Sequence, residues 1–138
     1  MRPPKGIQPK DLHIDIMRSQ LSRARGMGSA KSGVGHWWAQ RVSAVGLVPL
    51  TLWFIYSLLA LGAAPHAAVL AWAHEPLTLV LLLTLAGLTF YHMQLGLQVV
   101  IEDYVHDDTR RLIALLVVKG VTILLAVTSI VAILKIGL

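Results

Sequence analysis

Two long stretches of this 138-residue chain, residues 42–74 and 76–101, contain no aspartate, glutamate, lysine or arginine. A third apolar stretch, residues 112–134, contains a single charged residue, Lys119. A helix needs about 20 predominantly apolar residues to cross a bilayer, and each stretch is long enough. The sequence therefore predicts an all-α membrane protein with three transmembrane helices, at about residues 39–61, 76–101 and 112–134.

The composition supports a membrane location and excludes several kinds of chemistry. Hydrophobic residues make up 56% of the chain and charged residues 14%, whereas about a quarter of the residues in soluble domains are charged. The chain has no cysteine, so it can form no disulfide, thiol nucleophile or cysteine-ligated iron–sulfur cluster. No polar region is long enough for a soluble catalytic module, so the chemistry must come from the membrane part or from partners.

The first part of the chain is strongly basic. We interpret residues 1–36 as a basic tail containing glycine and serine, and residues 37–138 as the membrane anchor. Four glycines interleaved with serine and lysine predict a non-helical lead-in: Gly26, Gly28, Gly33 and Gly35. Nucleic-acid binding is the rival explanation for the charge, but membrane topology already accounts for basic residues beside a span, so no nucleic acid is expected.

The basic residues also predict an orientation. Ten of them lie in the N-terminal part and in the second connection, against only Lys135 at the opposite end. Positive residues stay on the cytoplasmic side, which places the N-terminus in the cytoplasm or the mitochondrial matrix. We expect a multi-pass protein of the bacterial cytoplasmic membrane or the mitochondrial inner membrane. The first connection, residues 62–75, is predicted to be a loop on the far side.

His92 is the strongest single clue to function, because an ionisable side chain inside a span is expensive and is a functional candidate by default. On a helix it shares a stripe with Gly96 and Asp103. Gly96 leaves a flat space one turn from the imidazole, which a planar cofactor could use. Histidine is a standard axial haem ligand, and a bis-histidine haem would need its second ligand from another subunit. A histidine hydrogen-bonded to a neighbouring helix is the alternative.

Tyr104 follows His92 by twelve residues, or about 18 Å along a continuous helix, which brings it to the cytoplasmic interface. Its hydroxyl could donate to a quinone carbonyl, and Asp103 could relay a proton as the quinone is reduced. The alternative is an ordinary interfacial tyrosine.

Lys119 is interpreted as a lysine that extends toward the interface, with a propionate or acidic partner as the second possibility.

The residues after His92 have the sequence LGLQVVIEDYV, residues 95–105. Together with His92, they resemble the haem-ligand helix of the small hydrophobic membrane anchor subunit of succinate dehydrogenase, of the alphaproteobacterial or mitochondrial type. The sequence WWAQRVSA at residues 37–44 and the three-span layout also resemble this family. The resemblance covers most of the chain beyond the basic tail.

The resemblance implies a set of site residues. In this family one haem b lies between two anchor subunits, with one histidine from each, and His92 matches that ligand to the haem iron. Arg41 matches an arginine that approaches a haem propionate, and His36 resembles a histidine near the haem or the quinone. Gly96 would pack against the haem. Tyr104 matches the tyrosine that contacts ubiquinone, with Asp103 beside it.

The resemblance also implies partners and a function. The three helices would join a larger bundle with a second anchor subunit, the cytochrome b subunit, and would carry an iron–sulfur subunit and a flavoprotein subunit. The chain would not oxidise succinate alone, but would help to pass electrons from succinate to ubiquinone. Two alternatives are a haem-free tether for soluble subunits and a small transporter or channel subunit, for which Gln94, Gln98 and Lys119 are the polar candidates.

Overall fold

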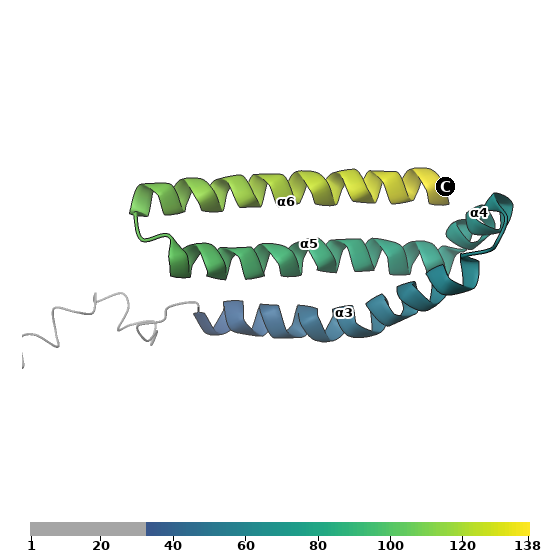
Figure 1. Cartoon of the computed structure of the whole chain (residues 1–138), viewed down its shortest axis with the longest axis horizontal. Helices are drawn as coiled ribbons and strands as arrows, with labels where there is room; N and C mark the ends of the chain where they lie inside the picture. The colour runs from purple at the N-terminus through teal and green to yellow at the C-terminus, as the bar shows by residue number, and fades with distance from the viewer. Residues whose placement is uncertain (1–32) are drawn as a thin grey trace, which may run out of the picture. The chain divides into compact units, whose positions relative to one another are not determined.

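The computed structural model describes residues 33–138, which form helices joined by short connections (Figure 1). The helices are α3 (Gly33–Leu61), α4 (His66–His74), α5 (Pro76–Tyr104) and α6 (Asp108–Gly137). Helices α3, α5 and α6 are 29 or 30 residues long and apolar enough to cross a membrane, whereas α4 has nine residues. Residues 33–138 contain no strand, so the predicted all-α membrane architecture is confirmed.

The long helices extend beyond the predicted spans. Helix α3 begins at Gly33, so the prediction of a non-helical glycine lead-in was wrong for residues 33–36. A glycine disfavours a helix by about 1 kcal/mol relative to alanine, but extending a helix that already exists adds a hydrogen bond per residue without a new nucleus. The rest of the predicted basic tail, residues 1–32, lies outside the described residues.

The connection predicted to be a loop contains a helix instead. Helix α4 follows Pro65, whose extended backbone occupies the N-cap position. Its sequence, HAAVLAWAH, is rich in alanine, the best helix former, and is too short to cross a bilayer. The ring of Trp72 on α4 stacks on Trp53 of α3, with centroids 5.9 Å apart and planes 26° apart. The connection is thus packed against the end of α3.

Helices α5 and α6 form an antiparallel hairpin. Helix α5 starts with Pro76, whose missing N–H is harmless in a first turn, and ends at Tyr104. After three connecting residues α6 begins at Asp108, with Asp107 as its N-cap: the carboxylate of Asp107 accepts a hydrogen bond from the backbone N–H of Arg110 at 2.8 Å. Such a short connection forces α6 back along α5, as Figure 1 shows.

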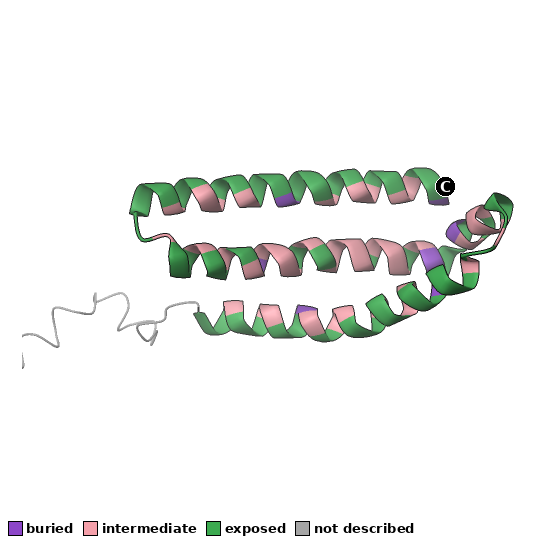
Figure 2. Cartoon of the chain, in the orientation of Figure 1, coloured by how far each residue is buried: buried purple, intermediate pink, exposed green. Residues whose placement is uncertain are grey.

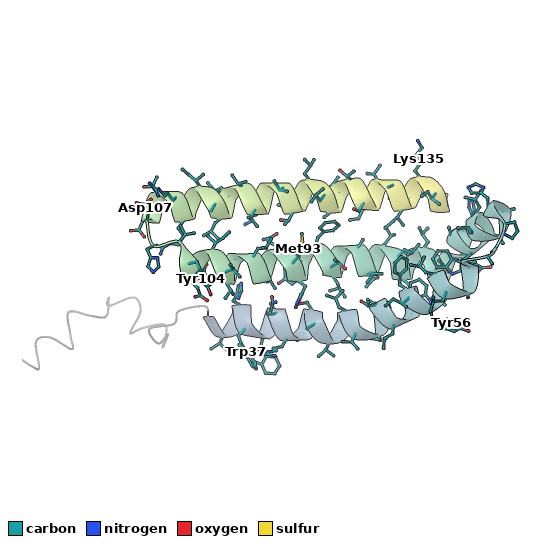
Figure 3. The ribbon with its side chains drawn as sticks, viewed as in Figure 1. Trp37, Tyr56, Met93, Tyr104, Asp107 and Lys135 are labelled. Atoms are coloured by element: carbon teal, nitrogen blue, oxygen red, sulfur yellow. The ribbon has the colours of Figure 1, made fainter. Side chains whose placement is uncertain are left out.

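Helix α5 is the central helix, because it contacts both α3 and α6. A β-carbon added to Gly46 of α3 would lie 3.2 Å from Cδ1 of Leu88 on α5, so the Leu88 side chain packs against the bare backbone of α3 there. Met93 lies on the side of α5 that faces α6 (Figure 3). Helix α3 changes direction about midway along its length (Figure 1), where Pro49 removes one backbone hydrogen bond from the helix.

Few side chains are buried within these helices. Of the described apolar residues only Ala73 and Leu95 are buried, at 4% and 7% exposure, and most large apolar side chains are exposed. Figure 2 shows how few residues of the helices are buried. The buried polar residues are small and carry hydroxyl groups: Ser43, Ser57, Thr78 and Thr122. Small residues at helix contacts and apolar residues on the outside are typical of a membrane bundle, in which lipid and further helices cover the outer surface.

Candidate functional site

The imidazole of His92 lies in the contact between α5 and α3. Its Nδ1 is 2.9 Å from the hydroxyl oxygen of Ser43, and its Nε2 is 3.2 Å from the side-chain amide nitrogen of Gln40. Ser43 is buried, with 3% exposure, and His92 and Gln40 are half-buried. The structure therefore contains the helix-to-helix hydrogen bonds that were one of the two interpretations of His92.

The Gly96 position faces the same residues of α3. A β-carbon added to Gly96 would lie 3.6 Å from the amide nitrogen of Gln40, which is an ordinary van der Waals distance. The space left by the missing side chain is thus beside the Gln40 amide, one turn from His92. His92 and Gly96 thus both lie beside the Gln40 amide of α3, on the shared stripe of α5 that the sequence predicted.

Two buried polar atoms near this contact have no hydrogen-bond partner among the described residues. They are Nε2 of His36 and the amide oxygen of Gln40. His36, Gln40 and Ser43 are four and three residues apart, which places them on one face of α3. This face of α3 carries a row of polar side chains where it meets α5, and part of its hydrogen-bonding capacity is unused.

Gln40 and Ser43 were not selected as site residues from the sequence. Their spacing from His36 was the available signal, because three polar residues recur on one helix face at the beginning of an apolar span. The signal is weak in the sequence alone, since polar residues at the end of a span also suit the lipid headgroup region.

Arg41 lies on a different side of α3 from this polar row. Its guanidinium carbon is 5.4 Å from the centroid of the Trp37 ring, close enough for a cation–π contact. Trp37 in turn meets Trp38 edge to face, with centroids 5.2 Å apart, and all three side chains are exposed. Within residues 33–138, Arg41 has no ion pair with a carboxylate. The structure does not bring Arg41 into contact with His92.

Asp103 and Tyr104 form the last turn of α5, so the helix continues without a break from His92 to the tyrosine. Tyr104 is 79% exposed, and Asp103 is also exposed. Figure 3 shows Tyr104 and Asp107 at one end of the helices, with Tyr56 and Lys135 at the other. Tyr104 is therefore separated from His92 by about 18 Å along the helix and is open on the outer surface of this chain.

A separate pocket of about 240 Å³ lies between α5 and α6. Its lining combines three polar side chains with aliphatic ones: Gln94, Gln98, Lys119, Leu112, Leu115, Leu116 and Val118. Gln98 donates to the carboxylate of Glu102 at 2.8 Å, and Lys119 is exposed. The sequence predicts that Lys119 extends toward the interface and groups it with Gln94 and Gln98 as polar candidates, and the structure places these three side chains together in a hollow between α5 and α6.

A family model described as the succinate dehydrogenase/fumarate reductase transmembrane subunit matches residues 15–128. The chain belongs to this family. The resemblance seen in the sequence around His92 and at residues 37–44 is thus confirmed at the level of the family. Membership makes the chain one subunit of a membrane-bound oxidoreductase complex and a multi-pass membrane protein.

Similar proteins carry related names. The succinate dehydrogenase hydrophobic membrane anchor subunit of Rickettsia bellii is 38% identical over 116 residues, 84% of this chain and 93% of that protein. The protein of the same name from Paracoccus denitrificans is 34% identical over 64% of this chain and 68% of its own length. The succinate dehydrogenase membrane anchor subunit of Reclinomonas americana is 26% identical over 67% of this chain and 80% of its own length. No solved structure matches the chain.

Proposed function

We propose that this chain is the membrane anchor of a succinate:quinone oxidoreductase and that His92 is an axial ligand of a haem b shared with a second anchor subunit. The observation that carries the proposal is the position of His92 in the α3–α5 contact, where Nε2 meets the amide of Gln40. An ionisable ring held inside the membrane by neighbouring side chains is more than a packing residue, because its burial is costly.

The surroundings of His92 fit a haem in three respects. The imidazole is a standard haem ligand, and Gly96 leaves the backbone of α5 bare one turn away. The unpartnered Nε2 of His36 offers a polar contact that the helices themselves do not use. Bound between two imidazoles, a haem b would supply a low-spin iron for one-electron transfer.

The Gln40 contact must break when iron binds. Nε2 of an imidazole has one lone pair, which can either accept from the Gln40 amide at 3.2 Å or ligate iron. The amide of Gln40 thus has the role of occupying Nε2 in the haem-free chain. Ser43 does not compete for the same lone pair, because it contacts Nδ1 on the other side of the ring.

Arg41 and His36 are the residues of this chain that we propose to contact the edge of a bound haem. The guanidinium of Arg41 contacts only the face of Trp37 among the described residues, so all of its N–H donors are available for a haem propionate. His36 lies one turn before Gln40 on the polar face of α3 and has an unpartnered Nε2. From that position the His36 ring would face the haem or the quinone.

The second part of the proposal concerns ubiquinone. Tyr104 ends α5 with its hydroxyl uncovered, which supports a site that partner subunits complete. The hydroxyl would donate to a quinone carbonyl, and the neighbouring carboxylate of Asp103 would hold a proton for the reduced quinone. An interfacial tyrosine without a ligand is the competing interpretation.

The partners and the topology follow from the same proposal. Residues 1–36 and 103–111 would face the cytoplasm or the matrix, on the inner side of a bacterial or mitochondrial inner membrane. There they would form a docking surface for the iron–sulfur subunit, which in turn carries the flavoprotein. Succinate is oxidised on the flavoprotein, and this chain holds the haem and the quinone.

A haem-free tether is the second candidate function. It is favoured by one observation: both ring nitrogens of His92 already have hydrogen-bond partners on α3. In that case the polar contact only holds α3 and α5 together, and the chain anchors the soluble subunits without carrying electrons.

A reduced-minus-oxidised absorption spectrum of the assembled complex tests the proposal. We expect a low-spin b-type signal in the wild type that His92→Ala weakens or abolishes, while the chain still inserts into the membrane. His66→Ala and His74→Ala are controls, because both residues are exposed on α4. A wild-type spectrum in the His92→Ala complex would rule out His92 as the ligand.

A further inference from the structure

The hydroxyl of Ser43 makes two contacts at once. Its oxygen is 3.1 Å from the backbone carbonyl oxygen of Gln40, to which it donates, and 2.9 Å from Nδ1 of His92. A serine hydroxyl has a single proton and can accept two further hydrogen bonds. When that proton is donated to the carbonyl of Gln40, the donor in the contact with His92 is Nδ1.

The third contact at this site leads to the same protonation state. The nitrogen of the Gln40 side chain carries two protons and can only donate, so Nε2 of His92 must accept from it at 3.2 Å. The other neutral tautomer would place an N–H of the ring against the NH₂ of the amide. With the nitrogen of the Gln40 amide toward the ring, all three hydrogen bonds are satisfied together when Nδ1 is protonated and Nε2 carries the lone pair.

Among the described helices, the hydrogen bonds of the other buried hydroxyl groups do not involve a histidine ring. Ser57 is buried on α3 and donates to the carbonyl of Trp53 at 2.9 Å, and Thr122 on α6 lies within hydrogen-bond distance of carbonyls of its own helix and of the amide oxygen of Gln94 on α5. Such bonds within a helix are the usual arrangement for serine and threonine in apolar helices. Ser43 has the same bond and uses a free lone pair of its oxygen for a ring on another helix.

We infer that Ser43 is a positioning residue that fixes the tautomer and the orientation of the His92 ring, so that Nε2 presents its lone pair to a ligand. The inference deepens the proposed function, since it assigns to this chain the outer hydrogen bond that a haem-ligating histidine needs. A hydrogen bond from the distal ring N–H raises the basicity of the ligating nitrogen and holds the ring. Ser43 thus acts on the haem through His92 without touching it.

Three variants of the assembled complex separate this role from simple packing. Ser43→Ala removes the acceptor, Ser43→Thr retains a hydroxyl at the same position, and Ser57→Ala removes a matched buried serine of α3 with no contact to an imidazole. For Ser43→Ala we expect the affinity for haem to fall about 10- to 100-fold. The midpoint potential of the remaining haem should become more positive, because a less basic ligand stabilises ferric iron less.

Ser43→Thr should restore the wild-type potential, and Ser57→Ala should leave it unchanged. Potentials of Ser43→Ala and Ser57→Ala that both equal the wild-type value would overturn the inference. A Ser43→Ala complex that does not assemble leaves the decision to a measurement on the unmodified chain. That measurement is the ¹⁵N spectrum of histidine in the haem-free full chain in lipid vesicles, with the His92 signals assigned from His92→Gln.

The spectrum should show a protonated Nδ1 and an unprotonated Nε2 at His92. Any other protonation state of this ring overturns the inference. The measurement needs no haem, so it also separates the two proposals. A b-type signal that survives His92→Ala removes the proposed haem ligation, whereas the role of Ser43 is tested by the tautomer of His92 and by the midpoint potential of Ser43→Ala.

Discussion

Gly137 on α6 lies directly against Leu79 on α5. A β-carbon at residue 137 would stand 2.6 Å from Cδ1 of Leu79 and 3.2 Å from the backbone oxygen of Ala73 on α4. Both distances are shorter than the optimum of about 3.5–4.0 Å for non-bonded carbon contacts. The absence of a side chain at Gly137 therefore allows α6 to approach α4 and α5 together.

Gly137→Ala should destabilise this contact. Leu79 can turn its methyl group aside, but the Ala73 carbonyl belongs to a helix backbone and cannot, so we expect a loss of about 1–3 kcal/mol in the free energy of unfolding. Unfolding of the complex in mixed micelles, followed by helical circular dichroism, would measure it. Gly120→Ala is the control, because a β-carbon there meets nothing within 4 Å. Equal effects at the two glycines would contradict the prediction.

Thr122→Val should weaken the association of α5 with α6. The Thr122 hydroxyl lies 3.3 Å from the amide oxygen of Gln94, and valine keeps the shape of the side chain but loses the donor. Hydrogen bonds between membrane helices average about 0.6 kcal/mol, with a maximum of about 1.7, and we expect a loss of stability in that range. Thr128→Val removes only a bond to the carbonyl of Leu124 in the same helix and should change stability less.

Tyr104→Phe should lower quinone reduction selectively. Leaving a buried partner without its hydrogen bond costs roughly 1–3 kcal/mol, so quinone reductase activity should fall about tenfold. Succinate oxidation with a soluble artificial acceptor should persist, and so should the haem spectrum. Tyr56→Phe is the control, since Tyr56 is an exposed tyrosine at the opposite end of the helices (Figure 3).

Equal losses of both activities in Tyr104→Phe would indicate failed assembly rather than a lost donor. Unchanged quinone reduction in an intact complex would leave Tyr104 as an ordinary interfacial aromatic residue.

Gln40→Leu should favour haem binding over the haem-free state. The amide of Gln40 bonds to Nε2 of His92 only when no iron is there, and a net hydrogen bond contributes about 0.5–1.5 kcal/mol. Removing it should raise the affinity for haem about two- to tenfold, measured as haem content at limiting haem supply. Gln98→Leu is the control, because Gln98 bonds to Glu102 on α5. A lower affinity in Gln40→Leu would mean that Gln40 helps to hold the haem.

The long helices were predictable because lipid requires about 20 consecutive apolar residues, and the charged residues mark where such stretches end. The exact ends were not, since α6 takes in Asp108 and Arg111, which form an ion pair in its first turn. A hydropathy profile detects only the apolar part of a helix, whereas the helix and its backbone hydrogen bonds continue into the headgroup region. Helix α4 is not predicted by the sequence, because the glycine and proline before it are typical of a loop.

The partners of His92 could not be predicted from periodicity. In a soluble protein the polar and apolar faces of a helix reveal which side packs, but in a membrane both lipid and protein contacts are apolar. The sequence identified His92 and Gly96 by their chemistry. It could not give the register that sets Gln40 and Ser43 of α3 opposite them, since that depends on side-chain packing between the helices, such as that of Leu88 against Gly46.

The order of the helices along the chain has a consequence for biosynthesis. Chains emerge from the ribosome N-terminal end first, so α3 is complete before α5 is made. When His92 enters the bilayer, Ser43 and Gln40 already lie in the preceding span, ready to accept from and donate to its ring. The imidazole of His92 can therefore be paired within this chain during insertion, before any haem or second anchor subunit arrives.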